Sequence, residues 1–334
     1  MRWEVGLLAV WCCSTAATAP PAPDCGTCHA AEAKLHAKTR MAHAMEPALI
    51  SAFGQNVPDQ SLHESKEGYS FVYRRVANGV SVTAVKGDDH TDGLIEWVLG
   101  AGAQGQTPLV RTADGTFESR VSYFPALHQF GITVGQDAGA SRSAKEALGH
   151  KQNARDLQAC LACHATAITR DLQPVVPGIQ CQRCHPGADD HAPGGGKLPL
   201  NPGKLDASAQ VKFCGECHRM KAPVDDAQLE NIRFQPLRLI KSRCFASGQL
   251  ACTTCHPAHQ DARRNDPEFY NQKCHTCHDG RTFHADQRQT GDCIGCHMPY
   301  VQLHPALKFT DHFIRVVKAG DLPSSIIRQR GTGS

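Results

Sequence analysis

Seven copies of one five-residue pattern, Cys-x-x-Cys-His, run through the chain. We number them motifs 1–7 in chain order, at residues 25–29, 160–164, 181–185, 214–218, 252–256, 274–278 and 293–297. This pattern is the attachment signature of c-type haem. Its two thiols can reach both vinyl groups of one porphyrin as thioethers, and the histidine that follows can ligate the iron. The pattern therefore predicts seven covalent haem c groups, each with one iron.

The residues that would make these bonds form two sets. The predicted cofactor-binding cysteines are Cys25, Cys28, Cys160, Cys163, Cys181, Cys184, Cys214, Cys217, Cys252, Cys255, Cys274, Cys277, Cys293 and Cys296. The predicted proximal iron ligands are His29, His164, His185, His218, His256, His278 and His297. Zinc sites and redox dithiols also use paired cysteines and stay open as alternatives. Haem is favoured because zinc does not need a histidine directly after every pair.

Histidines outside the motifs could supply the sixth iron ligand. Of 19 histidines, 12 are not proximal, while methionine is scarce, at five. Mostly bis-histidine haems of low potential are therefore expected, since axial methionine raises the potential. The distal candidates, chosen because they lie near a motif in sequence, are His43, His150, His191, His259, His284, His304 and His312. We expect His63, His90 and His128 not to be ligands; His36 is an alternative to His43, and His275 could ligate only a different haem.

Composition limits the class of protein. The 334 residues are 41% hydrophobic, enough for a conventional core, but 6% aromatic, and seven macrocycles would displace much of that core. The polypeptide carries a net charge of +3. Haem propionates would make the holoprotein acidic, so a nucleic-acid partner is not expected.

The N-terminus has the outline of a secretory signal peptide, which we place at residues 1–19. An apolar run at residues 5–13 follows Arg2, and Ala17-Thr18-Ala19 forms an A-x-A cleavage site. A membrane-anchoring helix is the alternative, although the run is short for a bilayer and no other segment of about 18 apolar residues exists. We therefore expect secretion across the inner membrane of a bacterium into the periplasm or the cell exterior, with no transmembrane span after cleavage.

One cysteine is left over from this account. Of 17 cysteines, fourteen lie in the motifs and two in the presumed signal peptide, which leaves Cys244. A buried thiol that packs as a small hydrophobe is favoured. An unusual haem ligand and an intermolecular disulfide stay open.

The elements that must hold the motifs divide the chain into segments. We expect a first haem segment at residues 20–65, a β-rich insertion at 66–135, a six-haem segment at 136–320 and a flexible tail at 321–334. Residues 30–45 favour a helix. Alternation at 69–73 and 80–85 predicts a hairpin, and further strands are expected at 94–99 and 117–124. The predicted fold is that of a multihaem cytochrome c, with short helices and loops around haem and a small antiparallel β subdomain.

A glycine motif lies inside the β-rich insertion. Residues 100–105 match G-x-G-x-x-G after a probable strand, as in dinucleotide-binding proteins. The motif must open a helix, whereas Thr107-Pro108 and a strand-like run follow here. The pattern therefore indicates a loop between strands, and no nicotinamide cofactor is expected.

A further signal comes from the segments at residues 178–185 (GIQCQRCH), 243–259 (RCFASGQLACTTCHPAH), 292–299 (DCIGCHMP) and 310–312 (TDH), and from those at 25–43 and 94–111. These segments resemble secreted multihaem cytochromes c of the family related to the tetrahaem cytochrome c of ammonia-oxidising bacteria. The resemblance implies covalent haem, haem pairs that are stacked or perpendicular, and electron transfer outside the cytoplasm. It implies no particular substrate.

The sequence favours an electron carrier, with seven haems, over an enzyme. Electrons would pass between redox partner proteins outside the cytoplasm, and extracellular electron transfer through self-association into a filament stays open. The alternative is a multihaem oxidoreductase that acts on a small nitrogen or sulfur compound at one open haem. Enzymes of that type often replace the motif histidine with lysine, and no Cys-x-x-Cys-Lys exists here. No catalytic residue is therefore proposed from the sequence.

Overall fold

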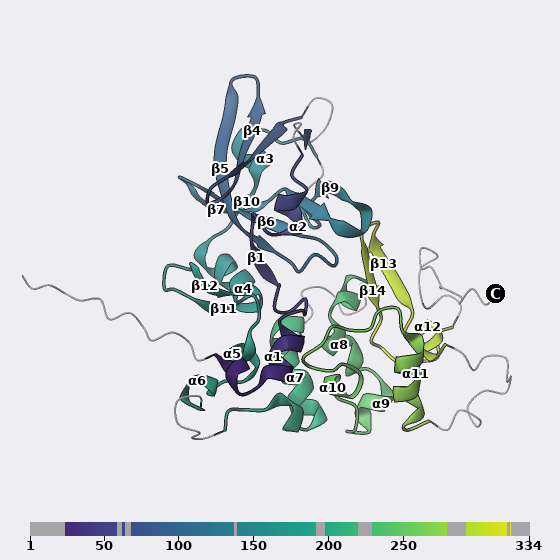
Figure 1. Ribbon diagram of the computed structural model, residues 1–334. Coiled ribbons are helices and arrows are strands. Elements are labelled where there is room, and N and C mark those ends of the chain that lie inside the picture. Colours follow the sequence, from purple (N-terminus) through teal and green to yellow (C-terminus); the bar gives the residue numbers. More distant parts are fainter. Residues whose placement is uncertain are drawn as a thin grey trace, which may run out of the picture.

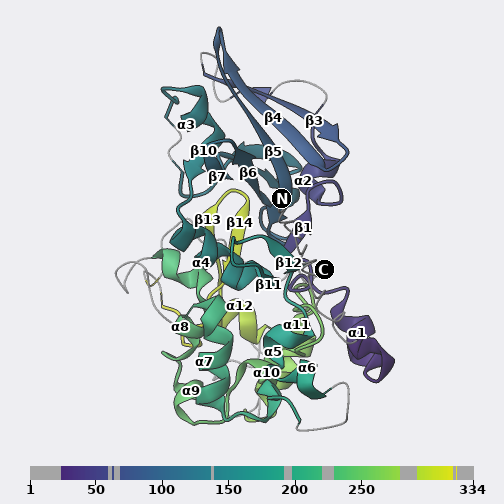
Figure 2. The same cartoon turned by 90° about the vertical axis from the view of Figure 1, so that its left-hand side faces the viewer.

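The computed structural model describes residues 24–58, 62–63, 68–136, 139–191, 198–219, 229–278, 292–318 and 321. The predicted signal peptide, His284, the side chain of His63 and all but one residue of the predicted tail lie outside the described residues. A sheet-rich half and a helical half lie one above the other, as two views at right angles show (Figure 1, Figure 2). No helix in the described part of the chain has both the length and the apolar character needed to cross a bilayer.

The sheet-rich half is built on one antiparallel sheet. Its strand order is β10-β7-β6-β5-β4-β3-β2, and β1 pairs with β5 beside this path. The strands are β1 (Met45–Pro47), β2 (Leu62–His63), β3 (Ser70–Val76), β4 (Gly79–Lys86), β5 (Asp89–Leu99), β6 (Thr107–Thr112), β7 (Gly115–Ser119) and β10 (Gly149–Lys151). The β3–β4 register, with Tyr73 opposite Val82, confirms the predicted hairpin. The sheet also takes strands from both sides of the 66–135 segment, since β1 and β10 belong to it.

The predicted strand at 117–124 is two strands in different sheets. β7 ends at Ser119, and β8 (Val121–Phe124) pairs with β9 (Gln129–Ile132) in a separate ribbon. Backbone N–H of Arg120 donates to Leu148 O, and its carbonyl accepts from Thr133 N–H. The chain therefore changes partners at Arg120, a break that alternation of apolar residues alone does not reveal.

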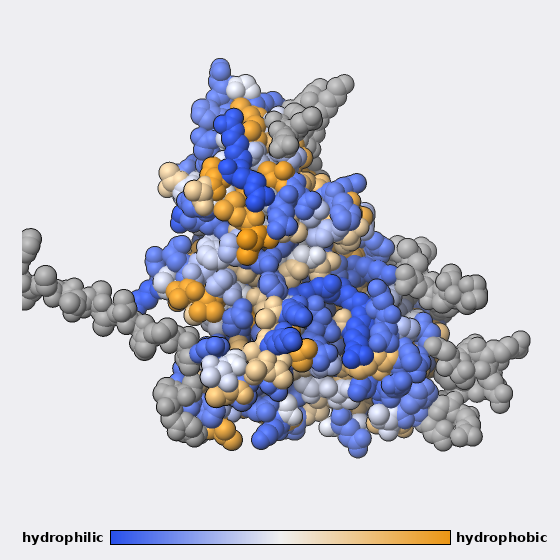
Figure 3. Space-filling model, viewed as in Figure 1, coloured by the Kyte–Doolittle hydropathy of each residue, from blue (hydrophilic) through white to orange (hydrophobic). Residues whose placement is uncertain are grey.

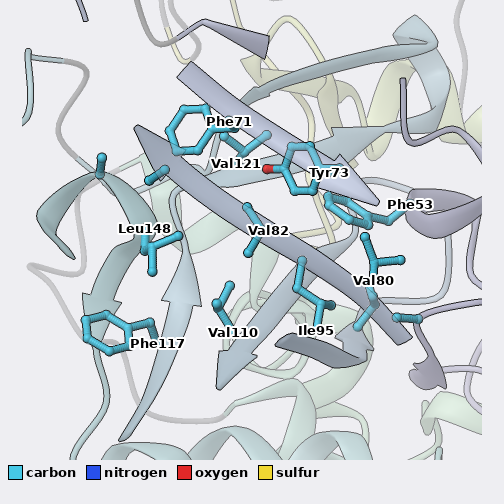
Figure 4. Packing of buried hydrophobic residues seen from close by; sticks show 14 of the residues in the cluster. Phe53, Phe71, Tyr73, Val80, Val82, Ile95, Val110, Phe117, Val121 and Leu148 are labelled. Carbon is cyan, nitrogen blue, oxygen red and sulfur yellow. The ribbon is translucent and has the colours of Figure 1, made fainter. Parts of the chain in front are cut away.

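A side-chain core fills the sheet-rich half. Figure 4 shows Phe71, Val82, Val110 and Leu148 converging from strands and from α3 (Ala144–Leu148). Tyr73 stacks edge-to-face on Phe53, with ring centroids 5.7 Å apart. Burial of such side chains, at about 25 cal/mol per Å² of apolar surface, stabilises this half.

The predicted helix at 30–45 is much shorter than expected. α1 (Ala30–His36) ends where the Thr39 hydroxyl donates to His36 O at 2.8 Å, and the chain then turns to bring Met45 beside Leu99 in the sheet. Pairing of β1 with β5 thus overrides a helical propensity of only a few tenths of a kcal/mol per residue.

The helical half consists of short helices joined by loops. They are α4 (Ala154–His164), α5 (Cys181–Cys184), α6 (Ala188–His191), α7 (Ala207–His218), α8 (Gln235–Leu239), α9 (Arg243–Ala246), α10 (Cys252–Cys255), α11 (Pro267–His275) and α12 (Cys293–His297). Four short 3-10 turns, Cys25–Thr27, Pro125–Leu127, Pro202–Lys204 and Leu229–Arg233, and α2 (Ala52–Gln55) complete the helices of the described residues. Asn153, Asp206 and Asp266 cap α4, α7 and α11 through their side-chain oxygens. On the face seen in Figure 3, hydrophilic side chains cover most of this half.

Two hairpins connect the halves. β11 (Ala165–Ile168) pairs with β12 (Pro174–Pro177), directly after motif 2. β13 (Tyr300–His304) pairs with β14 (Leu307–Thr310) and extends toward the sheet (Figure 1). There the Gln104 amide donates to Lys308 O at 2.8 Å and accepts from Lys308 N–H at 3.3 Å. The glycine motif at 100–105 is a loop between the antiparallel strands β5 and β6, as predicted. Through Gln104 it also contacts the β13–β14 hairpin.

Candidate haem-binding sites

Each motif folds into a single helical turn. In motifs 1, 3, 5 and 6 the histidine N–H donates to the carbonyl of the first cysteine at 2.9 Å. Motifs 2 and 4 lie inside α4 and α7, and motif 7 forms α12. Residues i, i+3 and i+4 of a helical turn share one face. The two thiols and the imidazole of a motif therefore point to the same side, as attachment to one porphyrin requires.

The motifs occupy two kinds of helix position. α5, α10 and α12 begin at the first cysteine of motifs 3, 5 and 7. α4 and α7 end at the histidines of motifs 2 and 4. α4, α7 and α11 begin well before motifs 2, 4 and 6, because the capping residues Asn153, Asp206 and Asp266 start them there.

Thiols of different motifs contact one another. Side-chain hydrogen bonds join Cys25 to Cys181, Cys163 to Cys217, Cys214 to Cys252 and Cys274 to Cys293. In addition, Cys184 lies near Cys214, and Cys255 lies near Cys274, close enough to affect their pKa values. These hydrogen bonds and close approaches of thiols place the motifs beside one another in the order 1-3-4-5-6-7. Motif 2 lies beside motif 4 through its thiol and beside motif 3 through the hydrogen bond from Arg183 Nη2 to Ala162 O, at 3.3 Å.

All seven motifs line one continuous cavity of about 4450 Å³. Divided among seven motifs, this is about 640 Å³ each, within the range of about 300–1,000 Å³ found for small-molecule and cofactor pockets. Protein interiors are close-packed and keep few voids larger than a water molecule. This cavity is partly open to solvent and has room for several bulky groups, and the cysteines and histidines on its wall are the residue types that hold haem c.

Backbone carbonyls fix the ring orientation of several motif histidines. Nδ1 of His164 lies 2.8 Å from Ala44 O, Nδ1 of His185 lies 3.0 Å from Leu200 O, and Nδ1 of His297 lies 2.9 Å from Arg315 O. A carbonyl oxygen can only accept, so Nδ1 must carry the proton in each ring. This leaves the Nε2 lone pair for a metal, which is the usual arrangement around metal-binding histidines.

Burial favours the neutral form of three motif histidines. It lowers the pKa of His164, His218 and His256, and at His218 a hydrogen bond with Gln235 opposes the shift. A neutral imidazole is the form that binds a metal. These rings are therefore in the ligating form at neutral pH.

Two distal candidates face motif histidines. The ring centroids of His259 and His185 are 6.2 Å apart, and those of His312 and His256 are also 6.2 Å apart. Imidazoles that ligate one metal from opposite sides, with metal–nitrogen bonds of about 2.0–2.1 Å, hold their centroids about 6.3 Å apart. Burial lowers the pKa of His312 to about 4, and its Nδ1 lies 3.0 Å from Thr310 O. Both pairs are thus spaced for one iron each.

Two more non-motif histidines and one histidine inside a motif line the cavity. His191, at the end of α6, has a buried Nδ1 without a hydrogen-bond partner among the described residues. His36 donates from Nε2 to Ile179 O at 2.8 Å, and its ring lies 6.5 Å from that of His259. His275 of motif 6 also lines the cavity. An orphaned buried nitrogen is costly, and a metal at this histidine would relieve it.

The other distal candidates lie away from the cavity wall. His43 is half exposed, with Nδ1 2.9 Å from Glu46 Oε1 and Nε2 2.9 Å from Ala37 O. His150 is exposed on β10, and His304 packs its ring against Phe124, 5.4 Å between centroids. Among the predicted non-ligands, His90 and His128 are exposed and likewise absent from the wall. Proximity to a motif in the sequence is therefore a poor guide to whether a histidine lines the cavity.

Cys244 lies beside motifs 5 and 6. Burial raises the pKa of Cys255 and Cys274, and the nearby Cys244 thiol adds to the increase at both. Cys244 also lines the cavity.

Among the residues that the structure describes, no three His, Cys, Asp or Glu side chains converge as they would around a bare metal ion.

Comparisons with known proteins identify a similar fold. The solved structure of outer cell wall cytochrome OcwA superposes with a TM-score of 0.52, at 16% sequence identity, over 90% of this chain and 80% of that chain. No protein-family model matches the chain, and no curated protein matches its sequence significantly. At this identity the likeness shows the fold alone, which this chain shares with that protein.

Proposed function

We propose that the chain is an electron-transfer protein that holds seven haem c groups, mostly with two histidine ligands and low potential, outside the cytoplasm. Haem supplies an iron that can accept and release one electron. The chain supplies thiols for attachment, neutral imidazoles for ligation and carbonyls that orient those imidazoles.

One observation carries this proposal: all seven motifs share the wall of one cavity and contact one another through their cysteines. Isolated pockets would suit seven independent cofactors. A shared cavity with motifs in the order 1-3-4-5-6-7 suits a function that needs neighbouring groups close together. Membership of the family related to the tetrahaem cytochrome c of ammonia-oxidising bacteria belongs to the same proposal, supported by the motif segments quoted above.

The location follows from the N-terminal sequence and from the likeness to OcwA, whose name places that protein in the outer cell wall. We propose secretion across the inner membrane, to the periplasm or cell exterior of a bacterium. Redox proteins are the proposed partners, and self-association into a filament would bring more copies of the same chain.

One observation favours the second function, a multihaem oxidoreductase. Among the described residues, the non-motif histidines and the in-motif His275 on the cavity wall number five, namely His36, His191, His259, His275 and His312. Seven irons would need seven distal ligands, and His284 is outside the described residues. An iron without a sixth protein ligand could bind a small nitrogen or sulfur compound.

A reductive titration of the purified holoprotein under carbon monoxide distinguishes the two functions. The carrier takes up seven electrons per molecule, keeps a low-spin spectrum and binds no carbon monoxide. One stoichiometric carbon monoxide site would establish an open iron and the oxidoreductase instead. Uptake of far fewer than seven electrons would contradict both.

A further inference from the structure

A buried ion-pair network lies on the segment that follows β14. The Asp311 side chain is 0% exposed. Its Oδ1 accepts from Arg238 Nε at 2.8 Å and from Phe313 N–H at 3.0 Å, and its Oδ2 accepts from Arg238 Nη2 at 2.8 Å and from Arg315 Nη1 at 2.7 Å. Arg238 belongs to α8, so the network binds this segment to another element.

Both ends of the same segment contact haem motifs. His312, directly after Asp311, places its ring 6.2 Å from that of His256 in motif 5. Arg315, whose guanidinium binds Asp311, offers its carbonyl to Nδ1 of His297 in motif 7, at 2.9 Å. One carboxylate thus connects the candidate distal ligand at motif 5 with the carbonyl that orients the proximal ligand at motif 7.

Further contacts tighten the segment. The Ser242 hydroxyl donates to His312 O at 3.3 Å and accepts from Ile314 N–H at 2.8 Å. The guanidiniums of Arg238 and Arg315 lie 5.4 Å and 4.6 Å from the centre of the Phe313 ring. With so many contacts, the backbone around His312 has little freedom to move, because the bidentate Arg238 pair fixes direction as well as distance.

Removal of the carboxylate would leave two positive charges close together. The side chains of Arg238 and Arg315 are 12% and 16% exposed. Breaking a buried ion pair on one side is strongly destabilising, because the remaining charge has lost its partner. The two guanidiniums would then repel each other and displace the segment that carries His312.

We propose that Asp311 is a positioning residue that, through Arg238 and Arg315, sets the axial histidines at two motifs, His312 opposite His256 and His297. This inference rests on the proposed function, since it presumes haem at motifs 5 and 7. Asp311 touches neither histidine ring in a hydrogen bond of the described structure; it acts through the backbone between them.

The test compares three variants of the full-length holoprotein by electron paramagnetic resonance, carbon monoxide binding and intact mass. Asp311→Asn removes the charge and keeps the size. Arg238→Lys keeps a charge but loses the paired donors. The matched control is Asp114→Asn, which also removes an aspartate from an ion pair, the 2.6 Å contact with Lys145, in the sheet-rich half.

We expect Asp311→Asn to retain seven haems by mass and to change the low-spin signals of two of them. Carbon monoxide binding should rise from zero to one site per molecule as His312 is released. Arg238→Lys should change the same two signals to a smaller extent, and the control should match the wild type. If Asp311→Asn yields no holoprotein, Arg238→Lys decides.

Two results distinguish a failure of the positioning role of Asp311 from a failure of the proposed function. Seven haems with unchanged signals in Asp311→Asn, or in Arg238→Lys where that variant decides, would overturn the positioning role and leave the proposed function intact. Fewer than seven haems on the wild-type chain would overturn the proposed function itself.

Discussion

Individual candidate distal histidines differ in whether their ring nitrogen atoms are available. His259 and His312 present rings opposite motif histidines, whereas both ring nitrogens of His43 are occupied by hydrogen bonds with Glu46 and Ala37. The sequence predicts seven proximal histidines by their adjacency to cysteine pairs, which is a local pattern. It could not rank the distal candidates, because a distal ligand arrives from another part of the fold and leaves no local pattern.

Substitution of a distal histidine should open one iron. In His259→Ala, the face opposite His185 loses its imidazole, so carbon monoxide binding should increase by one site per molecule. The measurement is a spectrophotometric titration of the reduced protein. His90→Ala, on an exposed strand residue, is the control and should add no site. If His259→Ala behaves like the control, His259 is not a ligand.

Asp89 contributes a pH-dependent part of the stability of the sheet-rich half. Asp89 Oδ2 accepts from the Tyr69 hydroxyl at 2.6 Å and from Ala144 N–H at 2.9 Å, and these hydrogen bonds lower the pKa of Asp89. A lowered folded-state pKa contributes stability above the unfolded value of about 3.9, and this is lost as the pH falls through the folded value.

Asp89→Asn should therefore lower the unfolding temperature at pH 7, with the difference from wild type shrinking as the pH falls below about 4. Thermal unfolding followed by near-ultraviolet circular dichroism measures this. A difference that is equally large at pH 7 and in acid would show that the charge of Asp89 is not responsible.

At the scale of elements, close backbone approaches hold the motif segments together. Gly178, between β12 and α5, has φ +69°, and a Cβ there would lie 1.9 Å from Ala42 O. Its N–H also donates to His164 O at 3.1 Å. This glycine therefore joins the segments of motifs 1, 2 and 3, and no larger residue fits.

Gly178→Ala should destabilise the holoprotein by more than the ~1–2 kcal/mol of left-handed strain alone, because a backbone clash is added. Gly248→Ala is the matched control, with φ +75° and no atom within 4 Å of the added Cβ. Denaturant unfolding of both variants measures the difference. Equal losses of stability would mean that the contact with Ala42 is relieved at no cost.

The elements were predicted unevenly from the sequence. The β3–β4 hairpin was found because residues 69–73 and 80–85 alternate as strands do, with a turn between them. The exchange of partners at Arg120, the early end of α1 and the joining of β1 and β10 to the sheet were missed, because each depends on pairing with a distant segment. In the helical half, loops and short helices carry little periodicity, so the spacing of the motifs was the main local signal there.

At the scale of the whole molecule, the interiors of the two halves differ. Side-chain packing fills the sheet-rich half, whereas a cavity of about 4450 Å³ occupies the space among the motifs. The sequence predicted seven closely spaced haems but not their order. The order 1-3-4-5-6-7, with motif 2 beside it, emerges only when the thiol contacts are known.

Because motif 2 lies beside the series of the other motifs, loss of motif 4 should slow electron transfer more than loss of motif 2. Cys214→Ala/Cys217→Ala removes motif 4, which contacts motifs 2, 3 and 5. Cys160→Ala/Cys163→Ala removes motif 2, whose thiol contact in the described part of the chain is the one between Cys163 and Cys217 of motif 4. Each variant should lose one haem, but film voltammetry should show a far larger loss of electron-transfer rate without motif 4. Equal losses would contradict the order.

The measurement that tests the central claim most directly is the intact mass of the mature polypeptide after secretion by a host that attaches haem c. The account predicts a mass equal to the cleaved chain plus seven haem groups. The mass of the bare polypeptide, or of the polypeptide with bound zinc, would contradict it.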